Sequence, residues 1–251
     1  MILLKKDEDF KYNYFMENKI SRSKIELFTE CPKCFYMDVK LGVKRPSIPG
    51  YTLNSAVDEL LKKEFDILRE KRESHELMKK YNIDAVPFQH EKLDEWRHNF
   101  TGVRMKHSSG ITVFGAVDDL WINSKGEIHV VDYKSTSTSD EISLDSEYKQ
   151  GYKRQAEIYQ YLMENNGFKV SKTAYFVFAN AQKNLEKFDS TLTFEMQIIP
   201  YEGDNSWVDS RISQIVKVME SFEIPLPSDS CKYCNYIHEY NNKSTTQPSL
   251  F

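Results

Sequence analysis

Two acids and a lysine in the middle of the chain have the types and the spacing of a hydrolytic metal site. Asp132 and Lys134 occupy alternate positions near the end of a predicted strand, so both side chains point to one face beyond two aliphatic residues. A predicted turn at residues 123–126 joins this strand to an earlier one that ends in Asp118. A partly buried charge is costly unless it is paired or bound to a metal. Asp118, Asp132, Lys134 and the carbonyl of Tyr133 could together hold a divalent cation and the water that it activates.

Three motifs follow one another in an order that resembles a known family. They are Gly115-Ala-Val-Asp118, Asp132-Tyr-Lys134 and Gln155-Ala-Glu-Ile-Tyr159. A single Asp-x-Lys is common by chance and is ordinarily a salt bridge at a strand end. The series, however, is similar to that of PD-(D/E)XK nucleases of the RecB-like branch, which includes the AddB nuclease domain and the iron–sulfur exonucleases of CRISPR adaptation. The resemblance implies a restriction-endonuclease-like α/β fold, with a mixed central β-sheet flanked by helices.

The same resemblance implies a role for each residue of the motifs. Asp118 and Asp132 would bind catalytic Mg²⁺ or Mn²⁺, and Lys134 would orient the hydrolytic water and offset the charge that builds on the phosphate. Gln155 and Tyr159 lie one turn apart on a predicted helix. The family's pattern has them position DNA or the attacking water, whereas the ordinary interpretation is a polar helix edge.

Asp58 lies near the start of a long amphipathic helix predicted for residues 52–81, at the edge of the apolar stripe. In the family, the corresponding helix usually presents a histidine to the catalytic metal. Aspartate at this position is a departure, although a carboxylate remains a good ligand for Mg²⁺ or Mn²⁺. The alternative is an acid favoured only by the helix dipole.

Four cysteines form two C-x-x-C pairs, Cys31 with Cys34 and Cys231 with Cys234. A helix with a serine N-cap is expected just before the first pair, with a break or restart at Pro32. The spacing alone favours Zn²⁺, whereas the resemblance favours a [4Fe-4S] cluster. The family, however, takes one ligand from the front of the chain and three from the back, and here Tyr240 stands where the last of these would fall. Either centre would be structural and would join the N- and C-terminal segments.

Composition limits the class of protein. The 251 residues include 34 Lys and Arg against 38 Asp and Glu, a net charge of −4, so any contact with DNA must come from local basic patches. No apolar run approaches the ~20 residues of a membrane span, and the first residues are too short for a signal peptide. We therefore expect a cytoplasmic protein with a single domain over residues 1–240.

Further elements are predicted from periodicity and turn signals: helices at residues 148–165 and 205–222, and strands at 173–179 and 191–200. Residues 241–251 are polar and are expected to be a flexible tail. This tail ends in Gln247-Pro-Ser-Leu-Phe251, which resembles the Gln-x-x-Leu-Phe peptide that binds the bacterial sliding clamp. Docking of its Leu and Phe on the protein itself is the alternative.

Together these features predict a metal-dependent deoxyribonuclease. The resemblance implies an exonuclease on single-stranded DNA or DNA ends, in repair, recombination or CRISPR-type adaptation. A nuclease-fold protein that binds DNA or scaffolds a recombination complex is the rival, and an RNA-directed enzyme is a minor one.

Overall fold

The structure is a computed structural model, and it describes residues 18–47 and 49–244. The chain, predicted as one domain, divides into two compact units. The described parts of Met1–Ile48, Lys106–Thr112 and Asp209–Phe251 form the first, which we call the cysteine unit. Pro49–Met105 and Val113–Val208 form the second, the sheet unit.

A five-stranded sheet is the centre of the sheet unit, with strand order β2-β5-β6-β7-β8. Its strands are β2 Val86–Pro87, β5 Asp119–Ile122, β6 Ile128–Thr136, β7 Thr173–Ala181 and β8 Phe194–Glu202. Strands β6 and β7 run parallel, whereas the other neighbouring pairs are antiparallel. The predicted mixed sheet of an α/β fold is therefore confirmed.

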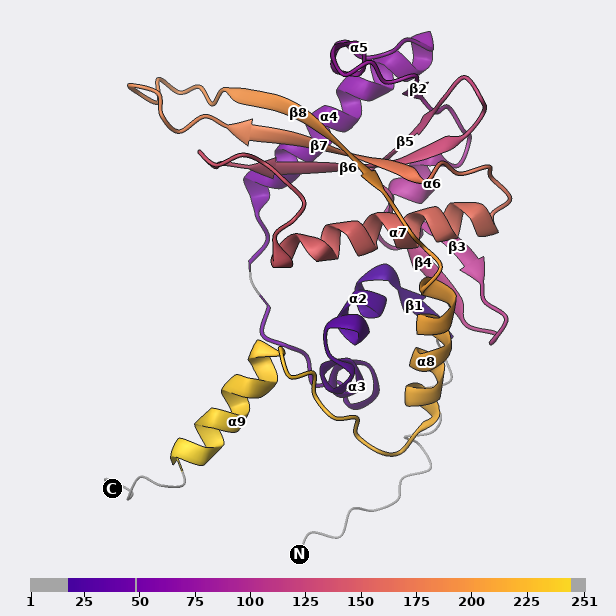
Figure 1. Cartoon of the computed structure of the whole chain (residues 1–251), viewed down its shortest axis with the longest axis vertical. Helices are drawn as coiled ribbons and strands as arrows, with labels where there is room; N and C mark the ends of the chain where they lie inside the picture. Colours follow the sequence, from indigo (N-terminus) through magenta and orange to yellow (C-terminus); the bar gives the residue numbers. More distant parts are fainter. Residues whose placement is uncertain (1–17, 48, 245–251) are drawn as a thin grey trace, which may run out of the picture. The chain divides into compact units, whose positions relative to one another are not determined.

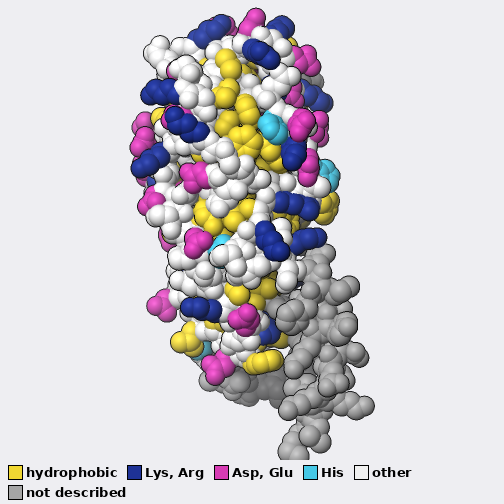
Figure 2. All heavy atoms as spheres, turned by 90° about the vertical axis from the view of Figure 1, so that its right-hand side faces the viewer, with side chains coloured by type: hydrophobic (Ala, Val, Ile, Leu, Met, Phe, Trp, Pro, Cys, Tyr) yellow, Lys and Arg dark blue, Asp and Glu magenta, His cyan; other side chains and the backbone are white. Residues whose placement is uncertain are grey.

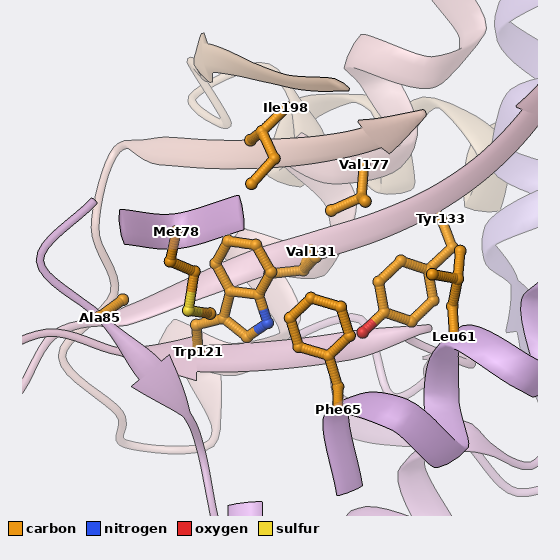
Figure 3. Packing of buried hydrophobic residues seen from close by; sticks show 9 residues of the cluster. All are labelled: Leu61, Phe65, Met78, Ala85, Trp121, Val131, Tyr133, Val177 and Ile198. Carbon is orange, nitrogen blue, oxygen red and sulfur yellow. The ribbon is translucent and has the colours of Figure 1, made fainter. Parts of the chain in front are cut away.

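Helices α4 (Thr52–Lys71) and α7 (Gln150–Asn165) cover opposite faces of this sheet (Figure 1). Odd-numbered residues of β6 turn towards α4, where Tyr133 packs near Phe65 and Trp121 in a buried aromatic cluster (Figure 3). Even-numbered residues of β6 turn towards α7, from which Gln155 reaches Asp132. The two-residue period of the strand therefore puts the aromatic cluster on one face and the polar motif on the other, where Ile128 and Val130 are also buried.

The predicted hairpin forms, but its first strand is shorter than expected. Strands β5 and β6 pair around a turn in which Gly126 has φ of 73°, a left-handed conformation that glycine adopts without strain. The apolar stretch before β5 is split, because β4 (Thr112–Gly115) ends before Asp118 and lies in another sheet with β3 (Val103–Lys106). At this break the backbone leaves the hydrogen-bonding pattern of the sheet, and the Val117 N–H donates to the Trp96 carbonyl.

The prediction of one long helix over residues 52–81 is wrong in its second half. Helix α4 ends at Lys71, and Arg72 follows in the left-handed conformation with φ of 56°. A short helix, α5 (Glu76–Lys80), starts again after His75, whose side chain accepts from the Leu77 N–H. The sequence contains no Gly or Pro at this bend, so periodicity alone could not reveal it.

The remaining elements of the sheet unit are short. They are α6 (Leu93–Arg97), which precedes β3, and η1 (Glu147–Lys149), which leads into α7. The cysteine unit contains β1 (Lys19–Ser21), α2 (Arg22–Glu30), α3 (Pro32–Leu41), most of α8 (Val208–Glu220) and α9 (Lys232–Ser244). Ser21 is the predicted N-cap of α2, and Pro32 starts α3 as expected.

Helix α9 continues to Ser244, so residues 241–244 of the predicted tail are helical. The predicted clamp-binding peptide Gln247-Pro-Ser-Leu-Phe251 lies outside the described residues. None of the helices in the described ranges is long and apolar enough to cross a membrane.

A buried ionic network holds β5 to α4 and α6. Asp119 is fully buried and forms ion pairs with Arg69 of α4 and, at 2.8 Å, with Arg97 of α6. The Tyr133 hydroxyl donates to its other oxygen at 2.6 Å. Asp66 accepts from both guanidinium groups and completes the network. Buried charges are tolerated only when they are paired in this way.

The network predicts a large effect on stability from a single change. Asp119→Asn removes the charge that compensates two buried guanidinium groups, so we expect the free energy of unfolding to fall by about 3–5 kcal/mol. Urea denaturation measures it. Glu76→Gln, which breaks an exposed ion pair with Lys79, is the control and should change nothing measurable. A loss for Asp119→Asn as small as that of the control would contradict this account.

Candidate active site and metal centre

Asp118 stands at a bend immediately before β5. Its Oδ2 accepts from the Tyr133 N–H at 3.1 Å, and its carbonyl accepts from Arg97 Nε at 3.0 Å. The backbone is also packed closely here, because a Cβ on Gly102 would lie 2.6 Å from the carbonyl of Gly115. The buried network thus fixes the position of Asp118, while 23% of its side chain stays exposed.

Asp132 is only 1% exposed, yet it is surrounded by polar groups. Lys134 forms an ion pair with its Oδ2, and Gln155 Nε2 donates to its Oδ1 at 2.7 Å. The Lys134 ammonium is thus the partner of Oδ2, and no other described residue donates to that oxygen. A divalent cation could bind there in place of the ammonium.

Burial dominates the acid–base behaviour of this pair. Removal from water raises the pKa of Asp132 to about 7, although the Lys134 ammonium opposes that rise and the Asp118 carboxylate adds to it. Burial disfavours the ammonium of Lys134 as well, but the charges of Asp132 and Asp118 outweigh it and raise the pKa of Lys134. Lys134 is therefore a cation at neutral pH.

Asp58 and Asp118 are joined by a residue that the motif analysis did not include. Lys62 Nζ lies 2.7 Å from Asp58 Oδ2 and 3.7 Å from Asp118 Oδ1. Burial, followed by the charge of Asp118, raises the pKa of Asp58. Lys62 follows Asp58 by one helical turn, so i,i+4 spacing was the available signal.

The structure brings most of the predicted site residues together. Tyr133 contributes its backbone at Asp118, whereas its side chain belongs to the core. Gln155 contacts Asp132 directly, and Tyr159 is 3% exposed within α7. Tyr152, which no motif indicated, lies beneath the Lys134 ammonium, 4.7 Å from the ring centroid.

These groups fit a hard divalent cation. Asp118 and Asp132 offer carboxylate oxygens, and a cation at Asp132 Oδ2 would take the place of the Lys134 ammonium. The acids do not converge as tightly as the cysteines. Among the described His, Cys, Asp and Glu residues, only the four cysteines form a group of three or more whose ligand atoms all lie within 4.8 Å of one another.

The cysteines form the predicted cluster in the cysteine unit. Cys31, Cys34 and Cys231 are buried, and Cys234 is partly exposed. Sulfur–sulfur distances are 3.8 Å for Cys31–Cys234 and 3.6 Å for both Cys34–Cys231 and Cys34–Cys234. Four thiols this close could bind a metal.

Arg45 is a neighbour of this cluster that the cysteine spacing could not indicate. Its Nη2 lies 3.7 Å from Cys231 Sγ, and its guanidinium stacks 4.5 Å from the ring centroid of Tyr233. Glu30 forms an ion pair with the same guanidinium. A fixed cation beside a thiolate offsets part of its charge.

Comparison with known proteins relates residues 50–238 to a family model described as PD-(D/E)XK nuclease superfamily. No curated protein matches the chain. Solved structures match it, among them the crystal structure of SSO0001, with 14% identity, a TM-score of 0.40, and coverage of 96% of this chain and 95% of that one.

The pKa of Asp132 predicts how metal binding depends on pH. The pKa of Asp132 in the folded protein lies above its ordinary value, so the proton bound to its carboxyl stabilises the folded state at low pH. This stabilisation is lost as pH rises through about 7. A divalent cation must displace this proton. We expect Mg²⁺ affinity to fall roughly tenfold per pH unit below about 7 and to level off above it.

Isothermal titration calorimetry between pH 5 and pH 8.5 measures this affinity. Asp132→Asn should abolish the pH-dependent binding, whereas Asp189→Asn, an exposed acid of the same unit, should leave it intact. Equal affinity at pH 5.5 and 7.5 would show that Asp132 is not the titrating ligand.

Proposed function

Because the chain belongs to the PD-(D/E)XK nuclease superfamily, we propose that it hydrolyses phosphodiester bonds of DNA with a divalent metal ion at Asp118 and Asp132. The observation that carries this proposal is the buried Asp132, held by Lys134 and Gln155 and close to the carboxylate of Asp118. Two carboxylates that approach each other in a buried site are a natural place for a divalent cation. Asp118 is held nearby, because its side chain accepts a hydrogen bond from the Tyr133 N–H. It supplies a second carboxylate.

Mg²⁺ or Mn²⁺, when bound, would polarise the phosphate and lower the pKa of an attacking water. Lys134 would act as a cation and not as a base, since its pKa is raised and it keeps its proton at neutral pH. The ammonium would donate to the water or to a phosphate oxygen and would stabilise the negative charge that develops there. Tyr152 beneath it would limit the directions in which the ammonium can point.

Gln155 and Tyr159 would then have different roles. Gln155 would act on Asp132, because it donates to Oδ1, whereas a metal at Oδ2 would take the place of the Lys134 ammonium. Tyr159, buried within α7, would position that helix and would not meet DNA through an open surface. The Tyr133 carbonyl and Asp58 would complete the set of metal ligands, and a cation near Asp58 would have to displace the Lys62 ammonium.

We propose DNA ends or single strands as the substrate. This choice follows the resemblance of the three motifs. On the face shown in Figure 2, basic and acidic side chains are interspersed, and the net charge is −4, so contacts with DNA would come from local basic residues. A DNA-binding scaffold without catalysis is the second candidate, and the presence of Asp118, Asp132 and Lys134 at one site argues against it.

The proposal predicts that Asp132→Ala and Lys134→Ala each lower the rate of cleavage at least 100-fold, because one removes a metal ligand and the other removes the charge that stabilises the transition state. Single strands labelled at the 5′ or the 3′ end, with Mg²⁺ or Mn²⁺ present, report the rate and the polarity. Lys187→Ala, an exposed lysine of the same unit, is the matched control. Near-full activity in either active-site variant, with circular dichroism unchanged, would refute the assignment.

A second prediction concerns Asp58. Asp58→His should preserve cleavage but shift the metal response towards Mn²⁺, since imidazole binds Mn²⁺ better than Mg²⁺. Metal titrations of the cleavage rate compare the two proteins, with Glu59→His on the exposed side of the same helix as control. Identical Mg²⁺ and Mn²⁺ curves for Asp58→His and the wild type would place Asp58 outside the metal site.

A further inference from the structure

The four cysteine sulfurs have the separation that one tetrahedral ion requires. A Zn–S bond of about 2.3 Å in a regular tetrahedron places neighbouring sulfurs about 3.8 Å apart. Three of the sulfur pairs lie at 3.6, 3.6 and 3.8 Å. No pair among the four exceeds 4.8 Å. The cluster therefore matches the dimensions of a single Cys₄ ion site.

The same distances leave no room for a [4Fe-4S] cluster. In such a cluster each thiolate binds a different iron, so the four sulfurs lie outside a core of four irons and four sulfides. A tetrahedron with edges of at most 4.8 Å has its centre within about 2.9 Å of each corner. A metal–thiolate bond of about 2.3 Å takes most of that length. Four separate irons cannot fit in what remains.

We propose that Cys31, Cys34, Cys231 and Cys234 bind one Zn²⁺ ion, and that the chain carries no iron–sulfur cluster. The pairing agrees with this, because each half of the site is a C-x-x-C pair whose first cysteine precedes a helix and whose second lies in its first turn. The two pairs contribute two ligands each. This set of two and two differs from the pattern of the family that the motifs resemble, in which one cysteine comes from the front of the chain and three come from the back.

The surroundings suit the charge of such a site. A zinc ion with four thiolates carries a net charge of −2, and the Arg45 guanidinium lies 3.7 Å from Cys231 Sγ. Stacking on Tyr233 and the ion pair with Glu30 hold that guanidinium in place. The N-termini of α3 and α9 add favourable dipoles at Cys31 and Cys231. The helix dipoles thus favour the thiolate form at the first cysteine of each pair, and Arg45 adds to this at Cys231.

A site with four cysteine ligands has no open position for water or substrate, so its role is structural. The ion would bridge segments about 200 residues apart in the chain, since sulfurs of residues 31 and 34 lie against those of residues 231 and 234. The small helix α9 has no buried residue of its own, and its attachment would depend on this ion.

Metal analysis of the full chain, purified without oxygen from cells supplied with both zinc and iron, tests the proposal. We expect one zinc per chain, less than a tenth of an iron, no acid-labile sulfide, and no visible absorption band. Replacement by Co²⁺ should give the visible spectrum of a tetrahedral thiolate site. About four irons and four sulfides per chain, or one iron per chain, would overturn it.

Two variants connect the ion to the named residues. Cys234→Ser should lower the zinc content at least fivefold, and Lys232→Ala, beside it on α9 and exposed, should keep one zinc per chain. Full zinc content in Cys234→Ser would overturn the ligand assignment. These readouts do not involve cleavage, so they stand whether or not the chain is a nuclease.

Discussion

The fully buried carboxylate of Asp119 is the constraint on which the sheet unit depends. Its ion pairs reach Arg69 on α4 and Arg97 on α6, and its hydrogen bond reaches Tyr133 on β6. One side chain therefore fixes two helices against two strands. Because Asp119 and its two arginine partners are charged and buried, their ion pairs cannot be exchanged for water without a large loss of stability.

Two adjacent acids have different roles, Asp119 in the packing of the core and Asp118 at the candidate active site. Asp119 points into the core, whereas Asp118 stands at the bend with its carboxylate partly exposed. Arg97 serves both, since one guanidinium binds the Asp119 carboxylate and the Asp118 carbonyl. The geometry of the candidate active site thus follows from the packing of the core.

The sequence was informative wherever a local rule sufficed. Strand alternation predicted the shared face of Asp132 and Lys134, and C-x-x-C spacing predicted the cysteine cluster. Arg69 and Arg97 could not be distinguished from solvated charges on helix surfaces, because their partners come from distant segments. Lys62 was overlooked for a related reason, since its second contact, Asp118, is 56 residues away in sequence.

The ends of α4 and β4 were not predicted for the same reason, which is that contacts between distant segments decide them. No Gly or Pro marks the end of α4, and Gly115, at which β4 ends, lies in a stretch that the apolar pattern predicts as one strand. Tertiary hydrogen bonds, such as the one from Val117 to Trp96, decide these positions. The metal preference at the cysteines was also open in the sequence, because both kinds of centre use four thiolates and only distances separate them.

The turn between β5 and β6 limits how this protein can change in length. Trp121 pairs with His129 and Ile122 with Ile128, so the turn at 123–126 sets the register of the whole of β6. Inserting or deleting one residue there would rotate Tyr133 out of the aromatic core and Asp132 into it. The exposed connection between β7 and β8 carries no such restriction. The chain could therefore change in length at residues 182–193, whereas the five residues between Ile122 and Ile128 must keep their number for the fold and the site to survive together.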